Sequence, residues 1–297
     1  MRDPDYALPT GSAAYLVMTV AVRLKTLRAA ASFAATVVGR FFLDQYAHAR
    51  RLRRGVSPVR VKNIEHPLDA CVPIRYEAAG VYLTFVKLWI GALSYFRRRL
   101  GRAFDDSIIE FLAGLGRCYS DAGSVYGRCL STTRRPDRAP SLRLAFVYAV
   151  DPHLFCVPSL HVLVVCYTYF RLRELLAATA DDGRFGRELD ALRARAVEIT
   201  ESILFVRQHS VNCIPTALAM LSVILPGYDE REAKAFMAEL FSIDVEVDSG
   251  DRARVVDYMA GLYDRVAPAG GRSEDRYDAI VDFLEAYDEP VLELAEA

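Results

Sequence analysis

The tetrapeptide Pro-Ser-Leu-His at 158–161 interrupts an apolar segment with groups that can bind and protonate an anion. Pro158 favours the first turn of a helix, where its missing N–H costs nothing. Backbone N–H groups at such a helix start carry partial positive charge and bind phosphate, and Ser159 lies among them. His161 falls in the same turn. The stretch therefore predicts a phosphate site; the alternative is a plain helix start with a hydrogen-bonded histidine.

A second polar group lies in the apolar run 201–213. Ser202 and His209 are seven residues apart and Cys213 follows four later, so on one helix the three would share a face. Arg207 lies among the same apolar neighbours. A buried cation and imidazole need a partner, because burial without one is costly. A phosphate would be such a partner; the alternative is a helix with one solvated face.

A third candidate is the pattern Arg-x6-Arg-Pro at 128–136. Arg128 and Arg135 have the seven-residue spacing that puts two side chains on one helix face. Pro136 favours the end of that helix, which would leave Arg135 at its edge. Arginine is common throughout the chain, so this pattern carries weight only beside the other two.

In chain order, the three groups resemble the signature of the type-2 phosphatidic acid phosphatase superfamily, which includes lipid phosphate phosphatases, bacterial acid phosphatases and vanadium haloperoxidases. The family's Lys-x6-Arg-Pro is matched with Arg128 in place of lysine. Its Pro-Ser-x-His is matched at 158–161, and its third motif is matched by Ser202 and His209. Neither the first 70 residues nor the acidic C-terminal part contributes to the resemblance.

The third motif departs from the family at one position. The family's aspartate corresponds to Cys213, and that carboxylate would hold the nucleophilic histidine in one tautomer and stabilise its cation. Asn212 could orient the ring by accepting a hydrogen bond, but it supplies no charge. Three outcomes stay open: another carboxylate substitutes, the enzyme is slow, or catalysis has been lost.

The resemblance implies a phosphatase that uses no metal and no cofactor. His209 would attack phosphorus and form a phosphohistidine, while His161 would protonate the leaving oxygen and then activate water. The other motif residues would hold the phosphate oxygens. These phosphate-binding residues are Arg128, Arg135, Ser159, Ser202 and Arg207.

Helices must position these residues, because the hydrophobic pattern is helical almost throughout. We expect an all-α fold: a helical bundle with transmembrane helices, followed by a small acidic helical extension. Soft boundaries give an N-terminal helical and basic segment (1–75), a phosphatase-like helical core (76–228) and an acidic helical extension (229–297). The net charge is +11 over residues 1–228 and −12 over the extension.

Three apolar segments are long enough to span a membrane: 79–96, 154–170 and 203–226. Three arginines follow the first, as is typical of a positive flank. We therefore expect a multi-pass protein of an inner or cytoplasmic membrane, without a clear signal peptide. The six cysteines show no metal-ligand spacing and are expected to be free thiols.

The expected substrate is a phosphate monoester or diphosphate, with a lipid phosphate favoured and nucleic acid excluded as a partner. One alternative is a lipid phosphotransferase, in which an alcohol takes the phosphoryl group from His209. Another is a catalytically impaired relative that binds lipid phosphate, which Cys213 favours. The last is a soluble helical interaction protein with a chance match. The sequence names no protein partner for the acidic extension.

Overall fold

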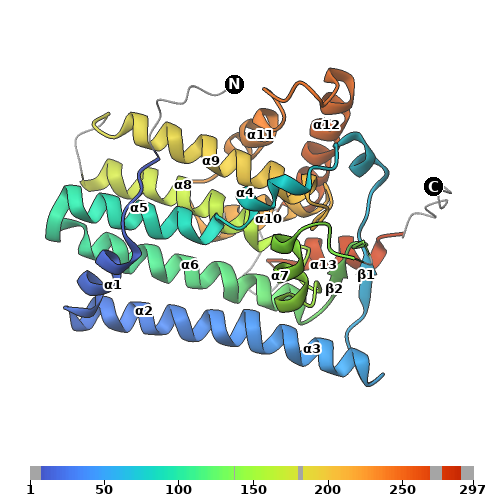
Figure 1. Ribbon diagram of the computed structural model, residues 1–297, viewed down its shortest axis with the longest axis horizontal. Helices are drawn as coiled ribbons and strands as arrows, with labels where there is room; N and C mark the ends of the chain where they lie inside the picture. The colour runs from blue at the N-terminus through green and yellow to red at the C-terminus, as the bar shows by residue number, and fades with distance from the viewer. Residues whose placement is uncertain (1–7, 137, 180–182, 268–275, 289–297) are drawn as a thin grey trace.

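The computed structural model describes residues 8–136, 138–179, 183–267 and 276–288, and over these the chain is mostly helical, as expected. Helix α8 (Leu160–Thr179) forms the centre of the bundle (Figure 1). Every residue from Val162 to Phe170 is buried, and a helix that is buried on all faces belongs in the interior. Four helices surround it: α5 (Phe85–Leu100), α6 (Asp105–Tyr126), α9 (Gly186–Phe205) and α10 (Cys213–Ile224).

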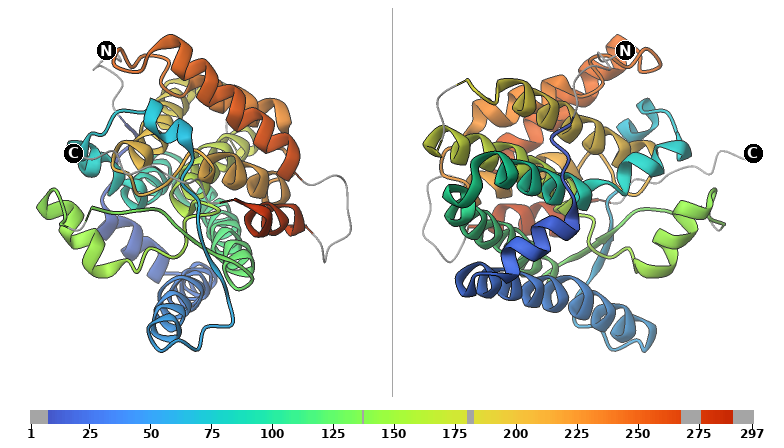
Figure 2. Two further views of the ribbon diagram at one scale, coloured as in Figure 1. Left: turned by 90° about the vertical axis from the view of Figure 1, so that its right-hand side faces the viewer. Right: turned by 60° about the vertical axis from the view of Figure 1, so that its left-hand side comes forward.

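Two groups of helices flank this bundle on opposite sides (Figure 2). On one side α1 (Ala13–Ala21) packs on α5, and α2 (Leu24–Val37) packs along α6. A π-helical segment, Val38–Leu43, joins α2 to α3 (Asp44–Arg53). On the other side α12 (Ser249–Val266) packs on α10, with α11 (Glu230–Glu239) and α13 (Asp278–Ala286) against α12.

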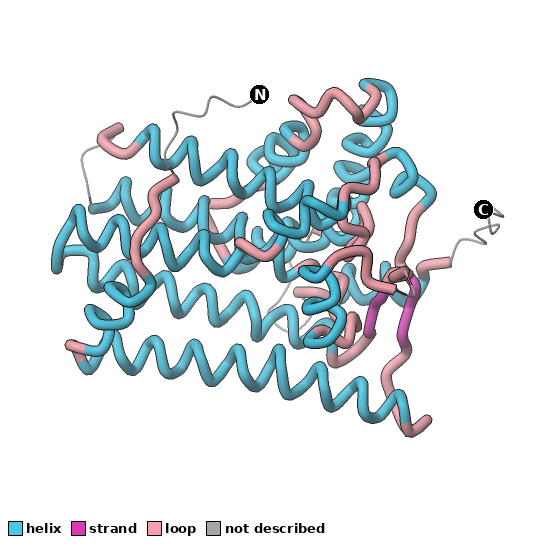
Figure 3. The backbone as a smooth tube through the Cα atoms, in the orientation of Figure 1, coloured by secondary structure: helices cyan, strands magenta, loops and turns pink. Residues whose placement is uncertain are grey.

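Two short strands lie at one end of the bundle (Figure 3). Strand β1 (Val61–Asn63) pairs in parallel with β2 (Leu130–Thr132), in the register Val61 opposite Leu130. Ser131 also bridges to Phe155, just before α8. The pairing therefore brings the segments after α3, after α6 and before α8 to the same end. Four shorter helices lie nearby or between: η2 (Pro67–Cys71), η3 (Tyr76–Ala78), α4 (Ala79–Tyr82) and α7 (Leu142–Val150), and a turn, Gly101–Phe104, joins α5 to α6.

Two segments expected to be helical are not. Helix α6 ends at Tyr126, and 128–136 runs through the short strand β2, which pairs with β1. Helix α9 ends at Phe205, and 206–212 forms a loop before α10. Arg207 in that loop has a φ of 53°, which a right-handed helix does not allow. The seven-residue spacings therefore do not reflect a helix face.

The start of α8 also differs from the expectation. The helix begins at Leu160, and Ser159 caps it by accepting a hydrogen bond from Val162 N (3.4 Å). Pro158 precedes the cap and follows a cis peptide bond, so it does not occupy the first turn. Ser159 and His161 keep their expected places at the start of the helix.

Two helical stretches, Leu24–Arg53 and Tyr76–Tyr126, are long and apolar enough to cross a membrane. Core helices of soluble proteins and N-terminal signal sequences have the same length and composition, so this is only a weak indication. The predicted span 203–226 is wrong, because the loop at 206–212 interrupts it, and 154–170 contains helix only from Leu160. In the predicted span 79–96, two turn residues at 83–84 separate α4 from α5.

Candidate active site

Strand β2 fixes the backbone that leads into α8. Ser131 O accepts a hydrogen bond from Cys156 N (3.3 Å), and Ser131 Oγ accepts one from Val157 N (2.7 Å). The Tyr126 hydroxyl donates to Pro158 O (2.5 Å). Ser131 and Val157 are fully buried, so water does not compete for these bonds. The carbonyl of Cys156 is therefore held in one direction.

His209 lies in the loop between α9 and α10 and is 7% exposed. Its Nδ1 is 3.2 Å from Cys156 O, and its Nε2 is 3.4 Å from Ser159 Oγ. A carbonyl oxygen can only accept, so Nδ1 carries the proton and Nε2 keeps its lone pair. The contact with the Cys156 carbonyl therefore leaves Nε2 as a nucleophile.

His161 lies beside His209 at the start of α8, with 5.6 Å between the ring centroids. The His161 ring stacks on Tyr82 of α4 (4.2 Å) and contacts the Phe85 ring (4.3 Å). The two histidines are 48 positions apart in the chain, and the fold brings their rings into edge-to-face contact. Two aromatic rings thus hold the orientation of the second imidazole.

Both imidazoles are neutral at neutral pH. Burial, together with the neighbouring His209, lowers the pKa of His161 to about 3. Burial lowers the pKa of His209 to about 4, although Asp151 and the Cys156 carbonyl raise it. A neutral His209 can attack phosphorus. A neutral His161 becomes a proton donor only when a bound anion raises its pKa.

Arg135 is the cation next to this loop. Its guanidinium donates to Asp151 Oδ2 (2.9 Å), Asp151 O (2.9 Å) and Gln208 Oε1 (2.6 Å), and it lies 4.6 Å from the centroid of the Tyr148 ring. Its Nε is buried, and among the residues that the structure describes nothing accepts a hydrogen bond from it. This N–H is a donor that a phosphate oxygen could use.

Asp151 is a carboxylate that the motifs did not reveal. It pairs with Arg135 and accepts a hydrogen bond from His153 N (2.9 Å). Burial raises its pKa, but the charge of Arg135, the neighbouring His153 and the hydrogen bonds that the carboxylate accepts together outweigh burial, so the pKa lies below its ordinary value. The ionised carboxylate in turn raises the pKa of both His161 and His209. Its one signal in the sequence is its position at a break between two apolar runs.

Arg207 is bonded to backbone rather than left open. It donates to Asp69 O and to Val72 O (2.8 Å). Asp69 accepts hydrogen bonds from Val211 N (2.8 Å) and Ser210 Oγ (3.1 Å), and burial raises its pKa to about 6. These bonds attach η2 to the histidine loop, so part of the donor capacity expected to serve phosphate is used within the protein.

A cavity of about 210 Å³ opens beside His209, and we call it the histidine pocket. Arg207 and His209 line it, and so does Arg134, which the motif pattern passed over in favour of the next residue. Arg134 is exposed; its backbone N–H donates to Glu65 Oε1 (3.0 Å), while its guanidinium lies 3.8 Å from Glu65 Oε2. In the sequence, the feature that could have identified Arg134 was the pair of arginines before Pro136.

Among the described residues, Arg207 and His209 are the predicted site residues that line this pocket. Arg135, Ser159 and His161 lie beside the histidine loop without lining the pocket, whereas Arg128 and Ser202 are bonded elsewhere. Arg128 pairs with Asp278 of α13 (2.5 Å) and is 48% exposed. Ser202 donates to Ile199 O (2.7 Å) and borders a separate cavity with Phe205. Each side chain is bonded elsewhere because neither 128–136 nor the whole of 201–213 is helical.

Asn212, suggested by the sequence as a group that could orient the histidine, is bonded elsewhere. Cys213 is fully buried, and its Sγ accepts a hydrogen bond from Ser210 N (3.4 Å). The Asn212 amide donates to Ile64 O (2.9 Å) and accepts from the Tyr258 hydroxyl (2.6 Å). Asn212 therefore does not orient His209, and the Cys156 carbonyl takes that place.

Comparison with known proteins adds no relative: no protein-family model, no curated protein and no solved structure matches the chain.

Proposed function

We propose that this protein hydrolyses phosphate monoesters or diphosphates through a phosphohistidine at His209. The observation that carries the proposal is the pairing of His209 and His161, whose rings lie 5.6 Å apart at the start of α8. The backbone carbonyl of Cys156 supports it further, because it leaves Nε2 of His209 unprotonated. The sequence resemblance to the type-2 phosphatidic acid phosphatases agrees with this assignment.

The reaction has two steps in this proposal. Nε2 of His209 attacks phosphorus, the ester P–O bond breaks, and the leaving oxygen takes a proton from His161. Water then attacks phosphorus and gives a proton to His161, the bond between phosphorus and Nε2 breaks, and phosphate leaves with His209 neutral again. The phosphate anion supplies the charge that raises the His161 pKa from its low value in the free protein.

Arginines would stabilise the charge on the phosphate oxygens. Arg135 offers its buried Nε, and Arg134 and Arg207 line the histidine pocket. Arg128 and Ser202 are not part of the proposal, since their hydrogen bonds lie elsewhere.

The test uses two substrates whose leaving groups differ in the need for protonation. His209→Ala should abolish hydrolysis and the acid-labile phosphoprotein that radiolabelled substrate forms. His161→Ala should slow an alkyl phosphate far more than p-nitrophenyl phosphate, because nitrophenolate leaves without protonation. His48→Gln, on α3, is the matched histidine control. Full activity in His209→Ala would overturn the mechanism, and transfer to added alcohols would indicate a phosphotransferase.

A lipid phosphate is a second substrate candidate, favoured by apolar side chains on the outer face of α7. Leu142, Phe146 and Val150 are 91%, 60% and 39% exposed and lie four residues apart, so they share one face of the helix. Such a face suits the surface of a bilayer. Co-sedimentation with anionic vesicles should fall in a Leu142→Asp, Phe146→Asp double variant, and unchanged binding would remove this support.

A further inference from the structure

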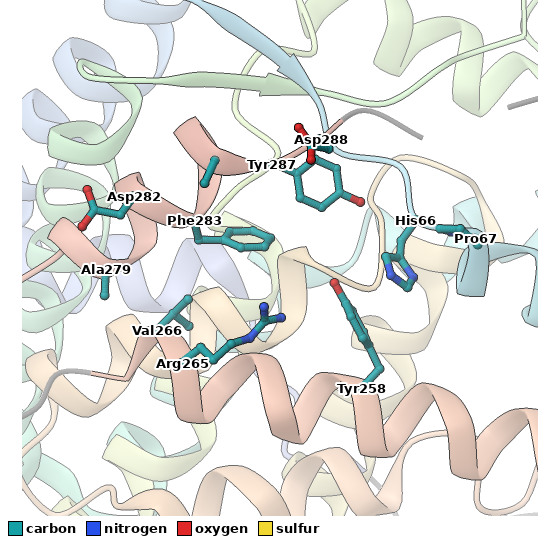
Figure 4. Close-up of a pocket in the computed structure, with 11 residues that line it drawn as sticks. His66, Pro67, Tyr258, Arg265, Val266, Ala279, Asp282, Phe283, Tyr287 and Asp288 are labelled. Carbon is teal, nitrogen blue, oxygen red and sulfur yellow. The ribbon is translucent and has the colours of Figure 1, made fainter. Parts of the chain in front are cut away.

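A second cavity, of about 660 Å³, neighbours the histidine pocket (Figure 4). His66 and Pro67 line both cavities, so the two share the wall at the start of η2. We call the second cavity the outer pocket. Its volume falls within the range of small-molecule sites. Besides His66, its walls include Tyr258 and Arg265 of α12 and Asp282, Phe283 and Tyr287 in or just after α13.

Aromatic rings surround the outer pocket. The His66 ring stacks on Tyr258, with 4.0 Å between centroids and 25° between planes. The Phe283 and Tyr287 rings meet edge to face at 5.4 Å. Figure 4 shows these rings on different sides of the same space. Flat ring faces favour a ligand that is itself planar or cyclic.

Charged groups share the pocket with the rings. The Arg265 guanidinium points from α12 into the space, and the Asp282 carboxylate lies on α13 across from it (Figure 4). A hydrocarbon chain in this space would displace water from these charged groups. It would offer no hydrogen bonds in exchange, which is costly. A ring that carries donors and acceptors avoids that cost.

The outer pocket is joined to the histidine loop by hydrogen bonds. The Tyr258 hydroxyl donates to Asn212 Oδ1 (2.6 Å), and Asn212 Nδ2 donates to the Tyr287 hydroxyl (3.0 Å). Asn212 is three residues after His209. The same side chains that border the outer pocket therefore fix the position of the loop that carries the proposed nucleophile.

Ion pairs and hydrogen bonds hold α13 in place as one wall. Arg128 pairs with Asp278 at the start of α13, and Lys62 Nζ donates to Tyr287 O (3.1 Å) after its end. Arg128 belongs to the first sequence motif and Lys62 to β1. The motif arginine thus positions the wall of the outer pocket instead of binding phosphate in this structure.

We propose that the outer pocket binds the alcohol half of the phosphate ester, and that this alcohol carries a planar or cyclic, hydrogen-bonding ring of about nucleoside size. The inference rests on the proposed hydrolysis, because it names the leaving group of that reaction. Phosphate in the histidine pocket and a ring in the outer pocket would place the ester across their shared wall, at His66 and Pro67. Between the two substrate candidates, the outer pocket favours a soluble ring-bearing ester over a lipid phosphate.

The experiment compares three phosphate esters on the full chain: adenosine 5′-monophosphate, glycerol 3-phosphate and phosphatidic acid in mixed micelles. Phe283→Ala should raise KM for the adenosine ester about fivefold to tenfold, the size expected for the loss of one ring face. The KM for glycerol 3-phosphate should stay unchanged. Phe283→Leu keeps an apolar side chain but removes the ring. It should therefore show the same selective rise in KM for the adenosine ester as Phe283→Ala. Phe42→Ala, at an exposed position in the π-helical segment Val38–Leu43, is the matched phenylalanine control.

Each outcome decides the proposal. Equal losses for all three esters, or a loss confined to phosphatidic acid, would overturn the ring pocket. If the wild-type protein hydrolyses none of the esters, the proposed function fails, and calorimetric titration with adenosine then tests the outer pocket alone. Adenosine binding that Phe283→Ala weakens would support the pocket, and absence of binding to the wild-type protein would refute it.

Discussion

Replacing His209 with glutamine removes an imidazole that the fold keeps neutral, and this change should alter how stability depends on pH. Burial holds the pKa of His209 at about 4, against about 6.5 in an unfolded chain. The folded state therefore binds fewer protons than the unfolded state between these values. Above pH 6.5 His209 is neutral in both states and does not lower the free energy of unfolding. As the pH falls from 6.5 towards 4, the unfolded state gains protons first and the free energy of unfolding decreases.

The size of the effect follows from the shift. Each pH unit below 6.5 costs about 1.4 kcal/mol, so at pH 5 His209 lowers the free energy of unfolding by about 2 kcal/mol. Asp69 acts in the opposite direction, because its pKa is raised to about 6 and its folded form takes up a proton first. That contribution is common to the wild type and the variant, so it cancels in their difference.

The assay is urea unfolding, followed by circular dichroism at several pH values from 5 to 8. His209→Gln lowers stability at pH 7 through lost contacts, but its further loss on going to pH 5 should be smaller than that of the wild type by about 2 kcal/mol. Ser159→Ala removes the Nε2 contact without removing a titrating group, and its pH dependence should match the wild type. Equal pH dependence of His209→Gln and wild type would refute the assignment of a buried neutral imidazole.

Four further substitutions test the site. In steady-state kinetics, Arg135→Gln should lower kcat/KM for a phosphate monoester about a hundredfold, whereas Arg128→Gln should change it less than about threefold. Equal losses would contradict the assignment of Arg135, but not Arg128, to the phosphate. Cys213→Asp should lower the free energy of unfolding by about 2–4 kcal/mol in chemical denaturation, because the position is fully buried. It should not raise the rate of hydrolysis, because Nδ1 of His209 is already bonded to the Cys156 carbonyl. A gain in activity would show that a carboxylate was needed there. Asp151→Asn should lower the pKa of the neighbouring imidazoles further, as NMR titration would detect, and unchanged titration would rule out its electrostatic role.

Residue type and order predicted the helical class of the fold and the encounter of the two histidines. His161 and His209 are each costly in an apolar environment, and this cost marks them in the sequence as residues with a partner. Arg207 stood out for the same reason, whereas Arg135 carried weight only through the Arg-x6-Arg-Pro pattern beside the other two groups. The fold brings both near the histidine loop. The resemblance to a phosphatase signature linked these positions without any knowledge of the path between them.

Other parts of the site depend on backbone geometry that spacing does not reveal. A separation of seven residues places Arg128 and Arg135 on one face only if the chain is helical, and here strand pairing at Ser131 replaces the helix. The group that orients His209 is the carbonyl of Cys156, and every residue has a carbonyl, so no residue type could have marked it. The outer pocket likewise depends on how α12 and α13 pack, which the acidic composition of that region did not predict.

Cys213 stands where the signature that the chain resembles has an aspartate, and two other groups can divide the tasks of such a carboxylate. A carboxylate in contact with a histidine both selects the tautomer and supplies negative charge. Here the Cys156 carbonyl selects the tautomer, while the Asp151 carboxylate supplies charge to both imidazoles from a greater distance. Arg135 pairs with Asp151 and offsets that charge in the free protein. A phosphate that draws the guanidinium towards itself would leave Asp151 less compensated, which raises the pKa of His161 at the moment when a proton donor is needed.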